Sequence, residues 1–207
     1  MYPYSETYTP ADDDTDALLD GSAGAGPFVP LVAGPGDGLG HLISITTTGG
    51  VNLSGLTFIV TGTDADGIPE TEAIVGPNNT TVYGAKYFKT VTGVTVSATT
   101  GADAFDMGWK DECVTPTFPM NWRQVDFQAT FGIDISGTIN FTQQNCDQDI
   151  RSVTNPANDL KWWDDAVVAS KTADTQGNYA YPVTATRTKV NSSTAGATFT
   201  QMILQGR

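Results

Sequence analysis

The sequence is poor in the residue types on which most catalytic and metal sites depend. Its 207 residues include one histidine, His41, and two cysteines, Cys113 and Cys146. His41 lies beside Leu42 at the start of an apolar strand, with no Ser or Cys nucleophile motif nearby. A Ser–His–Asp triad or a histidine-rich metal site is therefore not expected unless another chain supplies residues. Two cysteines cannot form a disulfide framework for a chain of this length, so we expect both to be buried free thiols.

Basic residues are missing from the first 85 positions. Residues 1–85 carry eleven Asp and Glu and no Lys or Arg, whereas residues 86–207 carry twelve acids and ten bases, and the net charge is −13. A nucleic-acid-binding surface needs a basic face, so the sequence predicts no nucleic-acid partner. The acidic half should also repel anionic lipid, and it favours solubility or contact with a basic protein surface.

Long apolar runs are absent as well. No stretch approaches the roughly 20 apolar residues that a membrane helix needs. The first residues, MYPYSETYTPADDDTD, have neither the basic cluster nor the apolar segment of a secretory signal. We therefore expect no membrane association and no secretory leader.

The sequence is rich in short strand-like segments that are separated by Gly, Pro and Asn. This spacing indicates an all-β fold of one or two antiparallel β-sandwich or barrel modules with an extended N-terminal arm. The predicted domains are residues 1–39 (an acidic arm and irregular lead-in), 40–112 (a first β module) and 113–207 (a second). Helical turns are expected only within residues 159–169, and a turn at residues 174–178. Strands are predicted at residues 41–47, 56–61, 70–75, 80–89, 94–98, 104–109, 125–135, 181–190 and 198–204.

The stretch from Ser54 to Val75 predicts a β-hairpin that reverses at Asp64-Ala65-Asp66-Gly67. An Asp at the start of a turn bonds its own backbone, and Gly accepts positive φ. Counted from Asp64, the stretch lacks the Gly and Glu positions of an EF-hand, so a turn is favoured over a calcium loop. A weak, irregular Ca²⁺ site from Asp64, Asp66 and Glu70 is the alternative. No metal or cofactor is predicted.

The N-terminal arm allows two interpretations. Its prolines, glycines and Asp12–Asp16 run are typical of a solvated tail, and its tyrosines are suited to an arm that orders on a neighbouring subunit. In the lead-in that follows, Phe28, Val29 and Leu31 are candidate apolar anchors. The interface residues predicted in these segments are Tyr2, Tyr4, Tyr8, Asp12, Asp13, Asp14 and Phe28.

The adjacent tryptophans Trp162 and Trp163 complete the predicted interface residues. Exposed rings of this kind stack on sugars, but large rings more often fill a core or a protein interface. The carboxylate pairs Asp164–Asp165 and Asp147/Asp149 lie in polar stretches, where solvated loops are expected instead of glycosidase chemistry. No catalytic residue is predicted.

Residues 43–109 resemble a segment of tailed-bacteriophage virion proteins. The shared pattern is SGLTFIVTGTDADG, then TEAIVGP, then KYFKTVTGVT and a closing GW. The end of the chain, YPVTATRTKVNSSTAGATFTQMILQG (181–206), is similar to the C-terminal part of such proteins. The resemblance implies a structural virion component, most like a capsid cement or decoration protein, and it implies no catalytic residue.

The resemblance also implies an oligomeric state, partners and a localisation. Such proteins are usually multimeric, often trimers at capsid symmetry axes, and they bind the major capsid protein or other virion proteins. Localisation in the virion after assembly in a reducing bacterial cytoplasm agrees with two unpaired cysteines. We therefore expect a non-enzymatic capsid-stabilising protein. The alternatives are a head–tail neck or tail component and, in another class, a carbohydrate-binding β-sandwich.

Overall fold

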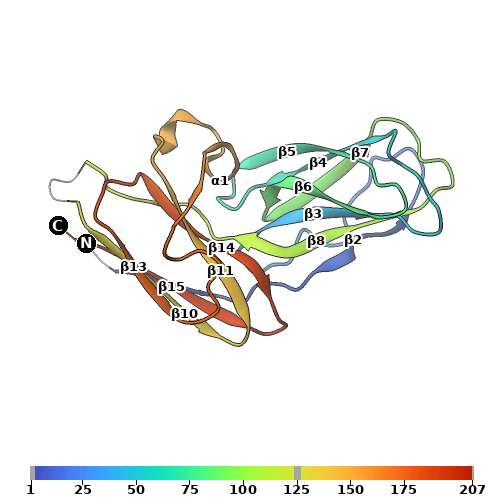
Figure 1. Ribbon diagram of the computed structural model, residues 1–207. Coiled ribbons are helices and arrows are strands. Elements are labelled where there is room, and N and C mark those ends of the chain that lie inside the picture. The colour runs from blue at the N-terminus through green and yellow to red at the C-terminus, as the bar shows by residue number, and fades with distance from the viewer. Residues whose placement is uncertain (1–2, 124–126, 207) are drawn as a thin grey trace.

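The computed structural model describes residues 3–123 and 127–206 and confirms the all-β class, with short antiparallel strands and little helix (Figure 1). A 3-10 turn, η1 (Ile150–Ser152), and a helical turn, α1 (Pro156–Asp159), accompany the strands. The strands are β1 (Tyr4–Tyr8), β2 (Asp14–Ser22), β3 (Gly40–Thr46), β4 (Thr57–Thr63), β5 (Pro69–Val75), β6 (Thr81–Phe88), β7 (Thr90–Val96), β8 (Phe105–Val114), β9 (Phe118–Pro119), β10 (Ala129–Ser136), β11 (Ile139–Cys146), β12 (Trp163–Asp164), β13 (Thr175–Tyr179), β14 (Ala185–Ser193) and β15 (Thr198–Gln205).

Three sheets organise the described chain. A 4-stranded sheet has the order β1-β15-β10-β13, and a 3-stranded sheet has the order β5-β4-β7. The third is an 8-stranded sheet with the path β12-β11-β14-β8-β3-β6, to which β2 and β9 add by pairing with β8 and β14. Figure 1 shows the 8-stranded sheet passing through both halves of an elongated molecule, with β11 and β14 in one half and β3 and β6 in the other.

Each half has its own core. In the half that contains the chain ends, alternating residues of β10 and β15 pack against β11 and β14, as the period-two pattern of residues 125–135 predicts for a half-buried strand. In the other half, β4 and β7 pack against β3 and β8 around Phe58, Val60 and Met107, which are fully buried. Burial of such side chains contributes roughly 1.5–3 kcal/mol each, so the two cores supply most of the stability.

Strand β8 joins the two halves. It pairs with β3 through most of its length and with β14 at Cys113 and Val114. Trp109 belongs to one core and Cys113 to the other. The predicted division between residues 112 and 113 stays a prediction, and the hydrogen-bonded strand crosses that position without a break.

The hairpin of residues 54–75 forms as predicted. Strands β4 and β5 pair from Thr57↔Val75 to Thr63↔Pro69. At the reversal, Asp64 N donates to Ile68 O at 2.8 Å, and the Asp64 carboxylate accepts from Asp66 N at 2.9 Å. Gly67 has a φ of +78°, which is the conformation for which a glycine is favoured in this turn.

The N-terminal arm is extended, but its described part lies along its own chain. Strand β1 pairs with β15 from Tyr4↔Ile203 to Tyr8↔Phe199, and β2 pairs with β8 with two register shifts. The interpretation as a tail without fixed structure is therefore wrong for these residues. Leu18 and Leu19 explain the docking of β2, because both are buried in the second core.

Three local predictions need correction. Residues 175–178 of the predicted 174–178 turn belong to strand β13, because β10 offers them a free edge. The helical turn precedes the predicted 159–169 stretch, since Pro156 occupies its first turn and Leu160 is already extended. The strand predicted from residue 125 is described only from Ala129, and residues 124–126 lie outside the described chain.

Candidate interaction surfaces

The arm tyrosines contact their own chain. Tyr2 lies outside the described residues. Tyr4 is half-buried with its ring 4.7 Å from that of Phe118, and Tyr8 is buried and stacked 5.2 Å from Phe199. Both hydroxyls donate to the Glu6 carboxylate, and burial followed by the Glu6 hydrogen bond raises the pKa of Tyr4 to about 12. An interface role for these rings stays a prediction.

The acidic residues of the arm are more accessible. Asp12 and Asp13 are exposed, whereas the half-buried Asp14 accepts from Ala17 N at 3.1 Å. Although Asp13 is exposed, its pKa is raised, first by partial desolvation of the carboxylate and then by repulsion from Asp111 of β8. The arm and β8 thus bring carboxylates of distant sequence positions onto one acidic surface.

A buried carboxylate–imidazole pair fastens the arm to the body. Asp37 Oδ2 lies 2.7 Å from His41 Nε2, and His41 Nδ1 lies 2.7 Å from the carbonyl oxygen of Lys110. The same carboxylate accepts from Ala11 N and Leu39 N, each at 3.0 Å. Burial would raise the pKa of Asp37, but the His41 hydrogen bond and the backbone N–H groups lower it overall. The single histidine thus has a structural environment, at the point where arm, lead-in and β3 meet.

The 28–33 loop, defined as Phe28 to Ala33, presents apolar side chains to solvent. Phe28 points inward and packs edge-on to Phe105, with ring centroids 5.1 Å apart. Val29 and Leu31 were expected to be anchors but are exposed, which corrects that prediction. Backbone hydrogen bonds of 2.7 to 3.0 Å fix the loop across the edge of β7 and to β2: Phe28 with Val94, Ala33 with Val91 and Leu31 with Leu18.

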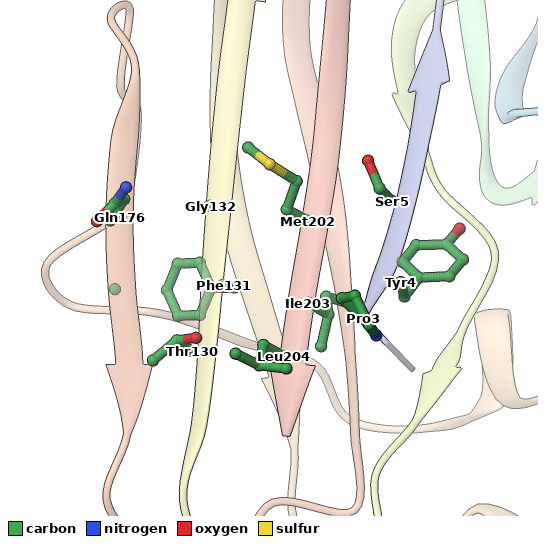
Figure 2. Close-up of a pocket in the computed structure, with 11 residues that line it drawn as sticks. Pro3, Tyr4, Ser5, Thr130, Phe131, Gly132, Gln176, Met202, Ile203 and Leu204 are labelled. Carbon is green, nitrogen blue, oxygen red and sulfur yellow. The ribbon is translucent and has the colours of Figure 1, made fainter. Parts of the chain in front are cut away.

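A groove crosses the outer face of the 4-stranded sheet (Figure 2). Its volume is about 350 Å³, and none of the residues that line it is charged. Figure 2 shows Met202 of β15 reaching toward β10, where Gly132 leaves room that a larger side chain would fill. Leu204 is half exposed beside it. The groove is thus a mildly apolar surface without the convergent charged or nucleophilic groups of a catalytic site.

A polar junction lies where the half built on β3 and β6 meets the half that contains the chain ends. The buried Glu70 carboxylate accepts from Lys86 Nζ at 2.7 Å, from Asn158 Nδ2 at 3.0 Å and from Asn155 Nδ2 at 3.1 Å. Burial opposes ionisation, but the Lys86 hydrogen bond and the other donors lower the pKa of Glu70. The Asn158 side chain also accepts from Tyr87 N and donates to Tyr87 O. These two hydrogen bonds hold α1 against β6.

Arg187 lies at the centre of this junction. It is almost completely buried, and it donates to Gln144 Oε1 at 2.7 Å and to Ala157 O at 2.6 Å. Its guanidinium lies 4.3 Å from the Trp162 ring centroid and 5.5 Å from that of Tyr87. Burial lowers the pKa of Arg187 to about 10. The ring of Trp162 therefore serves the interior of the molecule and not a free sugar-binding face.

Trp163 is the more accessible member of the predicted aromatic pair, with 47% of its surface exposed. Lys161 Nζ lies 3.9 Å from its ring centroid, which covers one face of the ring. The neighbouring carboxylates also have local partners: Asp164 accepts from Gln144 Nε2, and Asp165 accepts from Val167 N and Val168 N. The two tryptophans thus do not present a shared platform.

The remaining predicted groups have plain placements. Cys113 and Cys146 are buried and free, as predicted, and burial raises the pKa of the Cys113 thiol. Asp64 keeps its turn hydrogen bonds, and Glu70 is engaged at the junction. Within residues 3–123 and 127–206 no group of three or more His, Cys, Asp or Glu is arranged to hold a metal ion. In the same ranges no helix is long and apolar enough to cross a membrane.

Two features of the structure could not be predicted from the residue pattern: the exposure of Val29 and Leu31 and the burial of Arg187. The outward direction of Val29 and Leu31 has a faint signal, because the 28–33 loop contains no polar side chain. The burial of Arg187 has no signal, since a cation in a strand is ordinarily solvated. Its partners come from distant segments that only the fold brings together.

Comparisons with known proteins give little further guidance. No protein-family model matches the sequence, and no curated protein matches it. Among solved structures, the chain is similar to the major capsid protein P2 from bacteriophage PM2, with 8% identity over 98% of this chain and 97% of that chain and a TM-score of 0.24. A score this low does not establish a shared fold, so the likeness carries no conclusion about function.

Proposed function

We propose that this chain is a structural, non-enzymatic protein of a tailed-bacteriophage virion and that it stabilises the capsid as a cement or decoration protein. The observation that carries the proposal is the position of the two stretches that resemble such proteins. Residues 43–109 span β3 to β8, and residues 181–206 span β14 and β15. The resemblance therefore covers strands of both cores and does not rest on one surface hairpin.

The disposition of the polar groups supports a structural role. Asp37, Glu70 and Arg187 each make several hydrogen bonds that connect separate segments of the chain. Such networks hold a fixed body, whereas a general acid or base needs a group that can reach a substrate. A protein that reinforces a shell needs this kind of rigid body.

The charge distribution supports a protein partner. Eleven acids and no cation in residues 1–85 favour a basic protein surface over nucleic acid or anionic lipid. The partner that we propose is the major capsid protein or another virion protein. A homotrimer is the assembly that the resemblance implies, and it is part of the proposal.

Electron microscopy of particles from the phage that encodes this chain tests the proposal. Density for the chain on the capsid surface supports the cement role, and density confined to the neck or tail replaces that role with the alternative. Absence of the chain from purified particles would reject a virion role altogether. Sedimentation of the purified protein adds an independent check, because a trimer favours cement and a larger ring favours neck or tail.

A carbohydrate-binding module is the second candidate, and the exposed ring of Trp163 is the observation that favours it. Stacking of a sugar on this ring would change tryptophan fluorescence. The test is a titration with a panel of glycans, with Trp163→Ala as the matched variant. A response that the variant abolishes supports the module, whereas an unchanged signal across the panel rejects it.

A further inference from the structure

Three apolar side chains of the 28–33 loop stand clear of the molecule. Val29 is 77% exposed, Leu31 71% and Val32 46%. Scattered exposed apolar residues are common, but three within four positions on a loop without polar side chains form one patch. Phe28 anchors the start of the loop in the second core beside Phe105.

The backbone of the loop is fixed before any partner arrives. Its hydrogen bonds to β2 and β7 fasten the start, middle and end of the segment. Gly34 then approaches the turn after β6 so closely that a Cβ there would lie 2.6 Å from the carbonyl oxygen of Lys89. A preorganised loop loses little conformational freedom on binding, so exposed apolar area converts efficiently into affinity.

Acidic residues flank the patch. The Leu31 N–H bonds Leu18 O on β2, and Asp16 and Asp20 lie two residues to either side of Leu18, both exposed. Asp106 of β8 accepts from Gly21 N at 2.7 Å and so extends the acidic flank. At the Gly34 end the loop meets the backbone of Lys89. The patch is therefore apolar at its centre and predominantly negative along its β2 side.

We propose that the 28–33 loop, with Asp16 and Asp20, is a docking surface for a protein that presents an apolar socket with a basic rim. Complementary charge favours that partner. A second copy of this chain is disfavoured because two acidic patches repel, and residues 86–207 offer no excess of bases, with twelve acids and ten bases. This inference rests on the proposed function, under which the socket belongs to a capsid protein.

The test is co-sedimentation of the full chain with capsid particles of the encoding phage that were assembled without it. The variant Val29→Ser/Leu31→Ser/Val32→Ser should lower affinity by about tenfold or more, because it removes most of the buried apolar area. Val167→Ser is the matched control, since Val167 is 70% exposed in the other half and should bind like wild type. Unchanged circular dichroism and melting temperature show that each variant is folded.

The charge component is tested in the same assay. Raising NaCl from about 50 to about 500 mM should weaken wild-type binding, and Asp16→Asn/Asp20→Asn should bind more weakly with a smaller salt dependence. If the variant Val29→Ser/Leu31→Ser/Val32→Ser (the serine triple) binds particles as tightly as the wild type, the docking surface is wrong and the proposed function is unaffected. Wild-type chain that fails to bind particles at every salt concentration would instead count against the proposed function.

Two further results would overturn the choice of partner. Concentration-dependent self-association that the serine triple abolishes would assign the loop to a second copy of this chain. Flotation of the wild-type chain with neutral phosphatidylcholine vesicles, lost in the serine triple, would assign it to a lipid surface. The proposal is supported if the wild type and the serine triple have the same oligomeric state, independent of salt, and neither floats with vesicles.

Discussion

The guanidinium of Arg187 lies 4.3 Å from the centroid of the Trp162 ring, in the interior where the two halves of the molecule meet. Among the described residues Arg187 forms no ion pair with a carboxylate, and its charge is met by two acceptor oxygens and two aromatic faces. Cation–π contacts of desolvated cations contribute up to about 2 kcal/mol. The junction is thus held by a buried cation together with hydrogen bonds.

Arg187→Met should lower the free energy of unfolding by about 2–4 kcal/mol, because it leaves the buried oxygens of Gln144 and Ala157 without donors. Urea denaturation followed by circular dichroism measures the change. Arg151→Met is the matched control: its ion pair with Asp149 is exposed, and its loss should leave the free energy of unfolding close to that of the wild type. Equal effects of the two substitutions would show that Arg187 does not stabilise the junction.

Gly108→Ala should detach β2 from the body. A Cβ at Gly108 would overlap the carbonyl oxygen of Asp14, so either the arm or β8 must move. We expect a loss of about 1–3 kcal/mol and faster proteolysis within residues 9–22. Gly55→Ala is the control, because nothing lies within 4 Å of a Cβ there and its φ is not left-handed. If residues 9–22 of the Gly108→Ala variant resist protease as well as those of the wild type, the docking of β2 against Gly108 is contradicted.

Asp37→Asn should destabilise the protein by about 1–3 kcal/mol at pH 7, because an amide replaces the buried carboxylate that His41 Nε2, Ala11 N and Leu39 N contact. The pKa of Asp37 is lowered from its ordinary value of 3.8, so the unfolded chain binds this proton at a higher pH than the folded chain. The stability contributed by the pair is therefore fully present above pH 3.8 and is lost as pH falls through the folded-state pKa.

Urea denaturation of Asp37→Asn and wild type at pH 7 and near pH 3 measures this pH dependence. The difference between the two chains should shrink at the lower pH. Asp149→Asn serves as the control, since the exposed pair of Asp149 with Arg151 contributes little at either pH. A difference that stays constant with pH would assign the effect to lost hydrogen bonds instead of the charge.

Neither cysteine should react with Ellman's reagent in the native protein. Cys113 and Cys146 are both fully buried, and burial raises the pKa of the Cys113 thiol, so thiolate is scarce as well as inaccessible. Addition of denaturant should release two reactive thiols per chain. Rapid reaction of a thiol before denaturation would show that a core opens locally.

The sequence predicts local strand structure well in this chain because its strands alternate cleanly and its turns contain Gly and Asp. The hairpin of β4 and β5 is the best example: Asp64 and Gly67 suit only a tight reversal, and the structure has it there. Strand β13 was not predicted because its own residues do not favour a strand. Residues 174–178 have turn composition, and from Thr175 they form a strand because β10 offers unpaired backbone groups.

The surfaces were less predictable than the strands. Tyr4 and Tyr8 have the composition of adhesive arm residues, but Phe118 and Phe199 are the rings they contact. Whether an apolar residue of an irregular segment turns inward depends on which distant strands pass beneath it. Phe28 meets Phe105 and is covered, whereas Leu31 bonds the backbone of β2 through its N–H and its side chain stays exposed.

The pairing of β1 with β15 has a mechanical consequence. Tyr4 lies opposite Ile203, so the described ends of the chain meet at one pole of the molecule (Figure 1). Tension applied through these ends acts across the strand pair and opens it one hydrogen bond at a time, from Tyr4 toward Tyr8. Because Tyr8 belongs to the core of this half, the opening reaches the core at the end of β1. An attachment that must resist pulling is therefore better made through the body of the protein than through its ends.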